Sequence, residues 1–267
     1  MRVRNKQTNQ SVGTGRHRKK GQGETVPADG GERASRAQIG GGDGRLEATI
    51  GGAVVLSAPV HVNESLRYLL ATMAERLPRC VAVTSSVRGE GTTFISRTLA
   101  ALLAHDWQVT VCWIDLNWWK RGARAEAAMF QHSAADYFEG RCSIRDLPQE
   151  TSIPGLSMVH AGVVPVASRP LLTRSDRLET MIKSIRGSFD YVVFDLPPVL
   201  TTADSLNLAR LSDGYFLVAR HRATDIAQIR ASAVNMEAIR PLGVIINDAH
   251  HRGRRPVRFT PRSVALP

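Results

Sequence analysis

Residues 85–93 of the chain read Ser-Ser-Val-Arg-Gly-Glu-Gly-Thr-Thr, a loop of small residues between an apolar run and an amphipathic one. Such a loop at the start of a helix aims several backbone N–H groups at one point, and the helix dipole adds partial positive charge there. This pattern predicts a site for the phosphates of a nucleotide. Phosphate-binding loops of this type carry a lysine, but here Thr92 holds its place.

Two carboxylates and a hydroxyl are placed to hold a metal ion beside those phosphates. Thr93 ends the loop, and Asp115 and Asp195 each follow an apolar run of four residues. The carboxyl ends of parallel strands meet at one edge of a sheet, where ligands bind. Because Mg²⁺ prefers oxygen ligands, we predict a Mg²⁺ site at Thr93, Asp115 and Asp195. Both aspartates are also candidate catalytic groups, and Asp115 could position a water molecule.

Apolar runs alternate with amphipathic ones from residue 80 onward, which predicts an α/β fold with a parallel, doubly wound sheet covered on both faces. One helix, over residues 63–77, is predicted before the first strand, and residues 121–150 are less regular. The predicted strands are 80–85, 108–114, 156–160, 191–195, 215–219 and 243–246. The remaining predicted helices are 93–105, 174–186, 203–211 and 225–239.

The positive charge of the chain is concentrated at its two ends. The 267 residues carry a formal net charge of +11, but residues 1–45 hold ten Lys and Arg against four acidic residues, and residues 250–267 hold five Arg and no acid. We therefore predict a disordered basic Gly/Arg-rich tail over 1–52, one domain over 53–249 and a basic tail over 250–267. Because the domain itself is neutral, a specific nucleic-acid site is not expected, although the tails could contact anionic surfaces.

The three cysteines are odd in number and have no paired spacing, so neither a disulfide framework nor a zinc site is indicated. No run of about 18 apolar residues occurs, and no signal peptide is evident. These features lead us to expect a cytoplasmic protein. The eight histidines are scattered and indicate no metal site. Trp118 and Trp119 are adjacent, so we expect at least one to be exposed or packed on a partner.

Three segments resemble motifs of bacterial tyrosine kinases of the capsular exopolysaccharide family. The loop at 85–93 is similar to that family's S-S-x-P-G-E-G-K-[ST] segment. Residues 111–117 are similar to its second nucleotide motif, an apolar run followed by D-x-D, and residues 189–200 to its Y-D-Y-V-I-I-D-T-P-P-V-L motif. The resemblance covers residues 59–248 and implies a P-loop NTPase fold of the type shared with chromosome-partitioning and division-site ATPases.

The resemblance also implies ATP and Mg²⁺ as cofactors and a membrane-anchored polysaccharide co-polymerase or activator as partner. It implies a place at the inner face of the cell membrane through that partner, and a homo-oligomer is possible within the family. The cofactor-binding positions carried over are Arg88, Gly89, Glu90, Gly91, Thr92, Thr93 and Asn247.

The sequence departs from the family pattern mainly where phosphoryl transfer takes place. Thr92 replaces the lysine, Asn117 replaces the second aspartate of D-x-D, and Trp119 replaces the arginine that follows. Arg88 replaces a proline, and Leu70 stands at the second arginine of the family's E-x-x-R-x-x-R assembly motif. The tail after residue 247 contains no tyrosine, so the usual phosphate acceptors are missing.

The leading hypothesis is therefore a degenerate kinase-like subunit that binds nucleotide but transfers phosphate weakly or not at all. Removing one preorganised donor lowers a rate by roughly a hundredfold, about 3 kcal/mol, whereas the backbone N–H groups that bind nucleotide remain. A second hypothesis is an active ATPase or kinase in which Arg88, Lys120 or Arg121 replaces the lysine. A third is a partitioning-like ATPase whose basic arms bind DNA or another surface without sequence preference.

Overall fold

The computed structural model describes residues 44–120 and 123–249, which all belong to one compact unit. The predicted basic tails fall outside the described residues, except for the last residues of the first tail. Arg121 also lies outside them. The predictions that the basic tails are disordered and could contact anionic surfaces therefore stay predictions.

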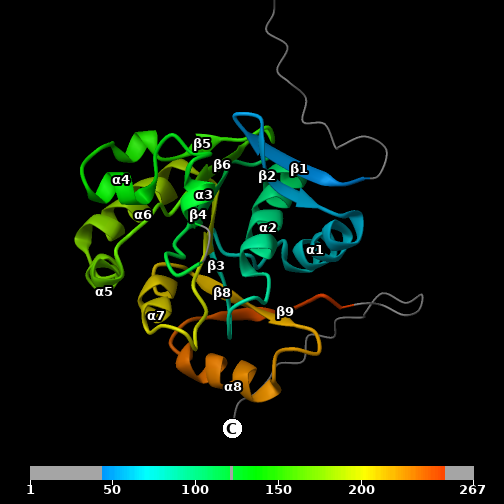
Figure 1. Cartoon of the computed structure of the whole chain (residues 1–267). Coiled ribbons are helices and arrows are strands. Elements are labelled where there is room, and N and C mark those ends of the chain that lie inside the picture. Colours follow the sequence, from blue (N-terminus) through cyan, green and yellow to red (C-terminus); the bar gives the residue numbers. More distant parts are fainter. Residues whose placement is uncertain (1–43, 121–122, 250–267) are drawn as a thin grey trace, which may run out of the picture. The chain divides into compact units, whose positions relative to one another are not determined.

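A seven-stranded sheet with the order β5-β6-β4-β7-β3-β8-β9 forms the centre of the domain (Figure 1). All neighbouring strands are parallel except β5, which pairs antiparallel with β6 at one edge. The strands are β3 (Cys80–Ser85), β4 (Val111–Asp115), β5 (Gln149–Glu150), β6 (Leu156–Val159), β7 (Tyr191–Asp195), β8 (Gly214–Arg220) and β9 (Pro241–Asn247). The predicted α/β fold with a mostly parallel sheet is confirmed.

Helices cover both faces of this sheet (Figure 1). The described helices are α1 (Val60–Met73), α2 (Thr92–Trp107), α3 (Ala123–Ala127), α4 (Ala134–Phe138), α5 (Arg169–Leu172), α6 (Asp176–Ser188), α7 (Asp204–Ala209) and α8 (Ile226–Asn235), with 3-10 turns η1 (Ile144–Asp146) and η2 (Val166–Ser168). Each long predicted helix is present, with ends shifted by a few residues. None of the helices in the described ranges has both the length and the apolar character needed to span a bilayer.

Two hydrophobic cores follow from the alternation of side chains along the strands. In β3, Val81 and Val83 face the core shared with α1 and α2, whereas Cys80 and Ala82 face the core shared with α6 and α7. Every residue of β3 is buried, which is typical of a central parallel strand. The loop that follows this strand is thereby held on a rigid element.

The tail predicted over 1–52 extends too far, because Leu46–Ile50 forms strand β1 of a two-stranded antiparallel hairpin with β2 (Ala53–Ala58). Alternate side chains of β1 are buried in the core that contains α2. Thr49 exchanges two hydrogen bonds with Ser152, of 2.9 and 3.0 Å, which fasten the hairpin to the turn before β6. The hairpin was missed because only five residues alternate beside a glycine-rich segment.

Candidate nucleotide-binding site

The glycine loop joins the end of β3 to the start of α2. Gly89 and Gly91 have φ values of 85° and 91°, in the region that favours glycine. Helix α2 begins at Thr92, one residue earlier than predicted. Its first N–H groups have no partners within the helix and its N-terminus carries partial positive charge. The loop and helix therefore have the conformation that the predicted anion site requires, and anion binding by them stays a prediction.

Glu90 and Asn247 hold this loop from behind. Glu90 is 2% exposed, and its carboxylate accepts a hydrogen bond from the backbone N–H of Val87 at 2.9 Å and another from the hydroxyl of Thr224. The side-chain amide of Asn247, the last residue of β9, donates to the carbonyl oxygen of Glu90 at 2.9 Å. These two predicted nucleotide contacts are thus loop anchors in the structure, and neither lines the cavity in front of the loop.

Replacing Gly91 with alanine is expected to destabilise the protein more than replacing Gly89. Both positions have positive φ, which costs an alanine about 1–2 kcal/mol. A Cβ at Gly91 would also overlap the amide of Asn247, whereas a Cβ at Gly89 meets nothing within 4 Å. Chemical denaturation without nucleotide measures both variants. Equal losses of unfolding free energy would contradict the anchoring role of Asn247.

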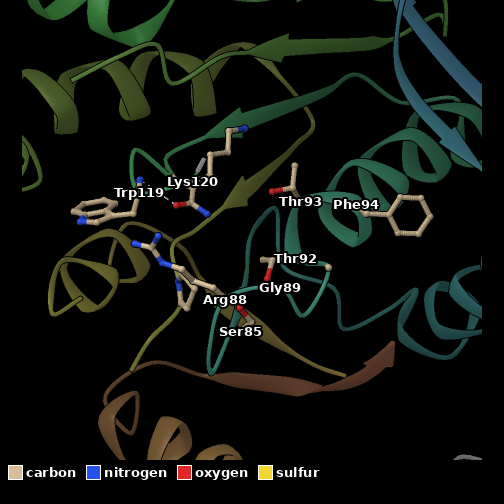
Figure 2. A pocket seen from close by; sticks show the side chains of 11 residues that line it. Ser85, Arg88, Gly89, Thr92, Thr93, Phe94, Trp119 and Lys120 are labelled. Atoms are coloured by element: carbon tan, nitrogen blue, oxygen red, sulfur yellow. Dashed lines mark hydrogen bonds between the residues drawn. The ribbon is translucent and has the colours of Figure 1, made fainter. Parts of the chain in front are cut away.

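A cavity of about 670 Å³ opens in front of the loop (Figure 2). It is large enough for a nucleotide-sized ligand. Its walls come from the glycine loop, the start of α2, the segment after β4 and the segment after β7. The lining residues are Ser85, Arg88, Gly89, Gly91, Thr92, Thr93, Phe94, Asn117, Trp119, Lys120 and Pro198.

Of the three predicted metal-binding residues, Thr93 lines this cavity, whereas Asp115 and Asp195 are fully buried beside it. Asp115 and Asp195 are register partners at the ends of β4 and β7, and the hydroxyl of Thr93 donates to Asp195 Oδ2 at 2.6 Å. Burial, reinforced by the negative charge of Asp115, raises the pKa of Asp195 to about 7. Asp195 Oδ1 is buried without a hydrogen-bond partner among the described residues. Thr93 and Asp195 therefore fit a Mg²⁺ ion.

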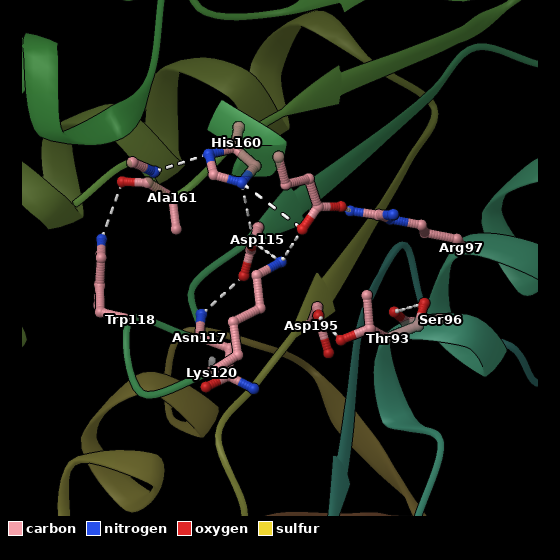
Figure 3. A network of polar contacts seen from close by, with 12 residues as sticks. Thr93, Ser96, Arg97, Asp115, Asn117, Trp118, Lys120, His160, Ala161 and Asp195 are labelled. Atoms are coloured by element: carbon pink, nitrogen blue, oxygen red, sulfur yellow. Dashed lines mark hydrogen bonds and ion pairs between the residues drawn. The ribbon is translucent and has the colours of Figure 1, made fainter. Parts of the chain in front are cut away.

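Asp115 is engaged differently. Its Oδ1 accepts a hydrogen bond from the backbone N–H of Asn117 at 2.9 Å, and its Oδ2 forms an ion pair with Lys120. The Lys120 ammonium also lies 2.9 Å from Glu126 Oε2 (Figure 3). Burial alone would lower the pKa of Lys120, but Asp115, Asp195 and Glu126 raise it above its ordinary value.

The buried charges extend from Lys120 to Arg97 on α2. Glu126 forms an ion pair with Arg97 as well as with Lys120, and the guanidinium of Arg97 lies 4.4 Å from the ring centre of Trp113. Burial raises the pKa of Glu126, but its contact with His160 and the charges of the two cations lower this pKa to well below its ordinary range. Sequence reasoning missed this network because Glu126 lies in the irregular stretch and has no motif around it.

Of the two adjacent tryptophans, Trp118 is 2% exposed, and its indole N–H donates to the carbonyl oxygen of Ala161 at 2.9 Å. Trp119 is half-buried and lines the cavity. The guanidinium of Arg169 lies 5.5 Å from the centre of the Trp119 ring. The expectation that at least one of these rings is exposed is wrong, because Trp119 packs against the same hydrophobic core as Trp118, with the two ring centres 6.2 Å apart. An aromatic side chain thus lines the cavity at the position where the resemblance predicts an arginine.

The sequence relatives of this chain are bacterial tyrosine kinases, although no family model matches it. One is the tyrosine-protein kinase CpsD of Streptococcus agalactiae serotype III, 27% identical over 172 residues, which cover 63% of this chain and 74% of the relative. Another is the tyrosine-protein kinase ptk of Acinetobacter johnsonii, 27% identical over 163 residues, 59% of this chain and 22% of the relative. The tyrosine-protein kinase etk of Escherichia coli is 27% identical over 179 residues, 66% of this chain and 24% of the relative.

Solved kinase domains of this type share the fold. The kinase domain of the Escherichia coli tyrosine kinase ETK superimposes with a TM-score of 0.63 at 24% identity, covering 76% of this chain and 81% of that one. The VpsO kinase domain gives 0.63 at 24% identity, covering 72% and 97%. The septum site-determining protein MinD from Pyrococcus horikoshii, in complex with Mg-ADP, gives 0.52 at 18% identity, covering 64% and 70%.

These comparisons confirm the resemblance that the three motifs indicate, and with it the P-loop type of α/β fold. The chain spans about three quarters of the streptococcal relative but less than a quarter of the Acinetobacter and Escherichia coli proteins. The activities of those whole proteins are therefore matters for proposal.

Proposed function

We propose that this chain is a nucleotide-binding regulatory or scaffold subunit in which phosphoryl transfer is weak or lost. One observation carries the proposal. The glycine loop and Thr93 line the cavity, and Thr93 is hydrogen-bonded to the buried Asp195, while the neighbouring position on the cavity wall is the uncharged Thr92. The groups expected to bind nucleotide are thus retained, whereas the lysine expected to assist phosphoryl transfer is missing.

In this proposal the loop binds the phosphates of ATP through its N–H groups and the α2 N-terminus. Thr93 and Asp195 would hold Mg²⁺, which neutralises charge on the phosphate oxygens. Thr92 contributes no charge to the transition state, and Asn117 turns its side-chain oxygen toward the backbone N–H of Trp119 at 3.3 Å. Catalytic positioning by this chain alone is therefore poor.

The cellular role that we propose follows the relatives. The chain would act beside a membrane-anchored polysaccharide co-polymerase at the cytoplasmic face of the membrane, in the synthesis or export of a polysaccharide. Supporting this role are the kinase names of the relatives and the kinase-domain fold. Nucleotide binding, rather than phosphate transfer, would then change how the subunit contacts its partner.

Titration of the purified chain with ATP in a calorimeter tests the proposal. We expect saturable binding that is tighter with Mg²⁺ than with EDTA, because Asp115 and Asp195 repel phosphates when no cation intervenes. Gly91→Ala is expected to lose this binding through distortion of the loop. No heat of binding under either condition would reject the proposed function.

An active enzyme that uses Arg88 in place of the lysine is the second candidate. The side chain of Arg88 is exposed and lines the cavity, so it can reach a bound phosphate. Robust ATP hydrolysis by the wild-type protein that is lost in Arg88→Ala would establish this candidate and displace the first.

A further inference from the structure

We infer that the rim of the nucleotide cavity binds an acidic segment of a partner protein through Arg88, Trp119 and Arg169. These three residues form the cationic rim. The inference rests on the proposed role as a subunit beside a partner, and it states the chemistry of the segment that the partner would present.

Two arginines without counter-charges lie at the cationic rim. Arg88 extends from the glycine loop toward Trp119 (Figure 2), and the guanidinium of Arg169 lies 5.5 Å from the centre of the same ring. Partial burial and the positive charge of Arg88 lower the pKa of Arg169. Neither arginine forms an ion pair with an acidic residue in the described parts of the chain. This local excess of positive charge fits an anionic ligand.

The guanidinium of Arg169 is held in a position to bind a carboxylate. Its Nε donates to the carbonyl oxygen of Val164 at 3.2 Å, and the ring of Trp119 lies beside it. These two contacts restrict the side chain, so less conformational entropy is lost when a ligand binds. Its two terminal nitrogens have no acceptor among the described residues. They carry the remaining N–H donors of the group, which can bind both oxygens of one carboxylate.

The segment that carries Arg169 also exposes apolar side chains. Val166 in η2 and Leu171 in α5 lie on either side of Arg169 in the sequence and are 71% and 77% exposed. Exposed apolar side chains beside an arginine and an aromatic ring are typical of protein interfaces. The expected ligand is therefore a chain segment that combines carboxylates with apolar side chains, rather than a small anion.

The phosphates of a bound nucleotide are the main competing counter-charge. Arg88 lines the cavity and could reach them, but Arg169 does not line it. Phosphates at the glycine loop would therefore leave Arg169 uncompensated, whereas a segment that crosses the cavity opening can offer one carboxylate to each arginine. Arg88 and Trp119 also replace a proline and an arginine of the kinase pattern. The cationic rim is therefore a feature of this chain rather than of the kinase motifs.

Photo-cross-linking on the full chain tests the inference. The probe is an octaglutamate peptide with one central benzoylphenylalanine, used below saturation, and mass spectrometry maps the linked residues. The basic tails of the chain also attract such a probe, so the position of the links decides the result. We expect links within residues 163–171 and beside Trp119, and none there with an octalysine probe of the same design. Links confined to the basic tails would overturn the inference.

Substitutions at the cationic rim measure the contribution of each group. Arg169→Gln and Trp119→Leu should each lower the yield of the rim links about threefold, the effect of one partly exposed charge pair or of its support. Combining Arg88→Gln with Arg169→Gln should lower it about tenfold. Arg230→Gln, at an exposed arginine on α8, is the matched control and should give the wild-type yield. An unchanged yield in the double variant would overturn the inference.

Calorimetry with Mg-ATP separates this inference from the proposed nucleotide binding. Arg169→Gln should leave the affinity for Mg-ATP within about twofold of wild type, since this residue does not line the cavity. A loss of about tenfold or more would assign the arginine to the nucleotide and overturn the inference. Failure of the wild-type chain to bind Mg-ATP, with the rim links retained, would instead reject the nucleotide-binding function alone.

Discussion

Thr92→Lys is expected to raise the rate of ATP hydrolysis by about a hundredfold. Phosphoryl transfer depends on electrostatic stabilisation of the equatorial phosphate oxygens, and one preorganised donor changes a rate by about 10²–10³. Thr92 lines the cavity at the first position of α2, so a lysine there would extend toward the bound phosphates. Steady-state release of phosphate, measured with wild type in parallel, gives the ratio.

Thr92→Met is the matched control for this gain, because it adds comparable length without charge. It should leave turnover at the wild-type level. Adding Asn117→Asp to Thr92→Lys should raise the rate further, since it restores the second carboxylate of the motif. Fast hydrolysis by the wild-type protein, with no gain from the lysine, would mean that another cation already serves the transition state.

Asp195→Asn is expected to stabilise the protein at pH 8 in EDTA by about 1–3 kcal/mol. The pKa of Asp195 is raised to about 7, first by burial and then by the charge of Asp115. Between about pH 4 and 7 the folded state keeps a proton that the unfolded chain releases, so stability falls as the pH rises through this window. Asparagine removes this loss. The difference between variant and wild type should therefore shrink toward pH 4.

Asp190→Asn provides a control of opposite sign. Asp190 accepts hydrogen bonds from the backbone and hydroxyl of Thr110, which lower its pKa. Its ionised form therefore supports folding above pH 4, and the amide should reduce stability at pH 8. Thermal unfolding in EDTA at pH 5 and pH 8 measures both variants. A destabilised Asp195→Asn protein at pH 8 would contradict the stored repulsion between Asp115 and Asp195.

Such repulsion is typical of a site built for a cation rather than for stability. Asp195 Oδ1 has no hydrogen-bond partner in the described structure, yet it is fully buried. A buried carboxylate that lowers the stability of the fold is retained where it is needed for function. Retention of this arrangement beside Thr92 is the reason that the proposed function separates nucleotide binding from phosphate transfer.

The sequence predicted the central sheet well because buried parallel strands produce short continuous apolar runs. Strands 80–85 and 191–195 have the predicted bounds, and their register brings Asp195 beside the glycine loop. The meeting of Asp115 and Asp195 also follows from strand order alone. These features depend on local pattern and on one topological rule, both of which are visible in a single sequence.

The rest of the site depends on contacts between distant segments. Asn247 reaches the loop from β9, a separation of 157 residues from its partner Glu90. Glu126 meets Lys120 and Arg97 only after α2, α3 and β4 have packed. No spacing rule reports such contacts, because side-chain direction in an irregular segment is set by packing. Lys120 could be suspected from the sequence, but its carboxylate partners could not.

The most direct test of the account is to follow ATP bound to the purified wild-type protein. The protein is incubated with Mg-ATP, separated from free nucleotide, held for hours, and the bound nucleotide is identified by chromatography. We expect stoichiometric nucleotide recovered chiefly as ATP, with no phosphate on protein tyrosines. Recovery of ADP with phosphorylated protein, or of no nucleotide at all, would contradict it.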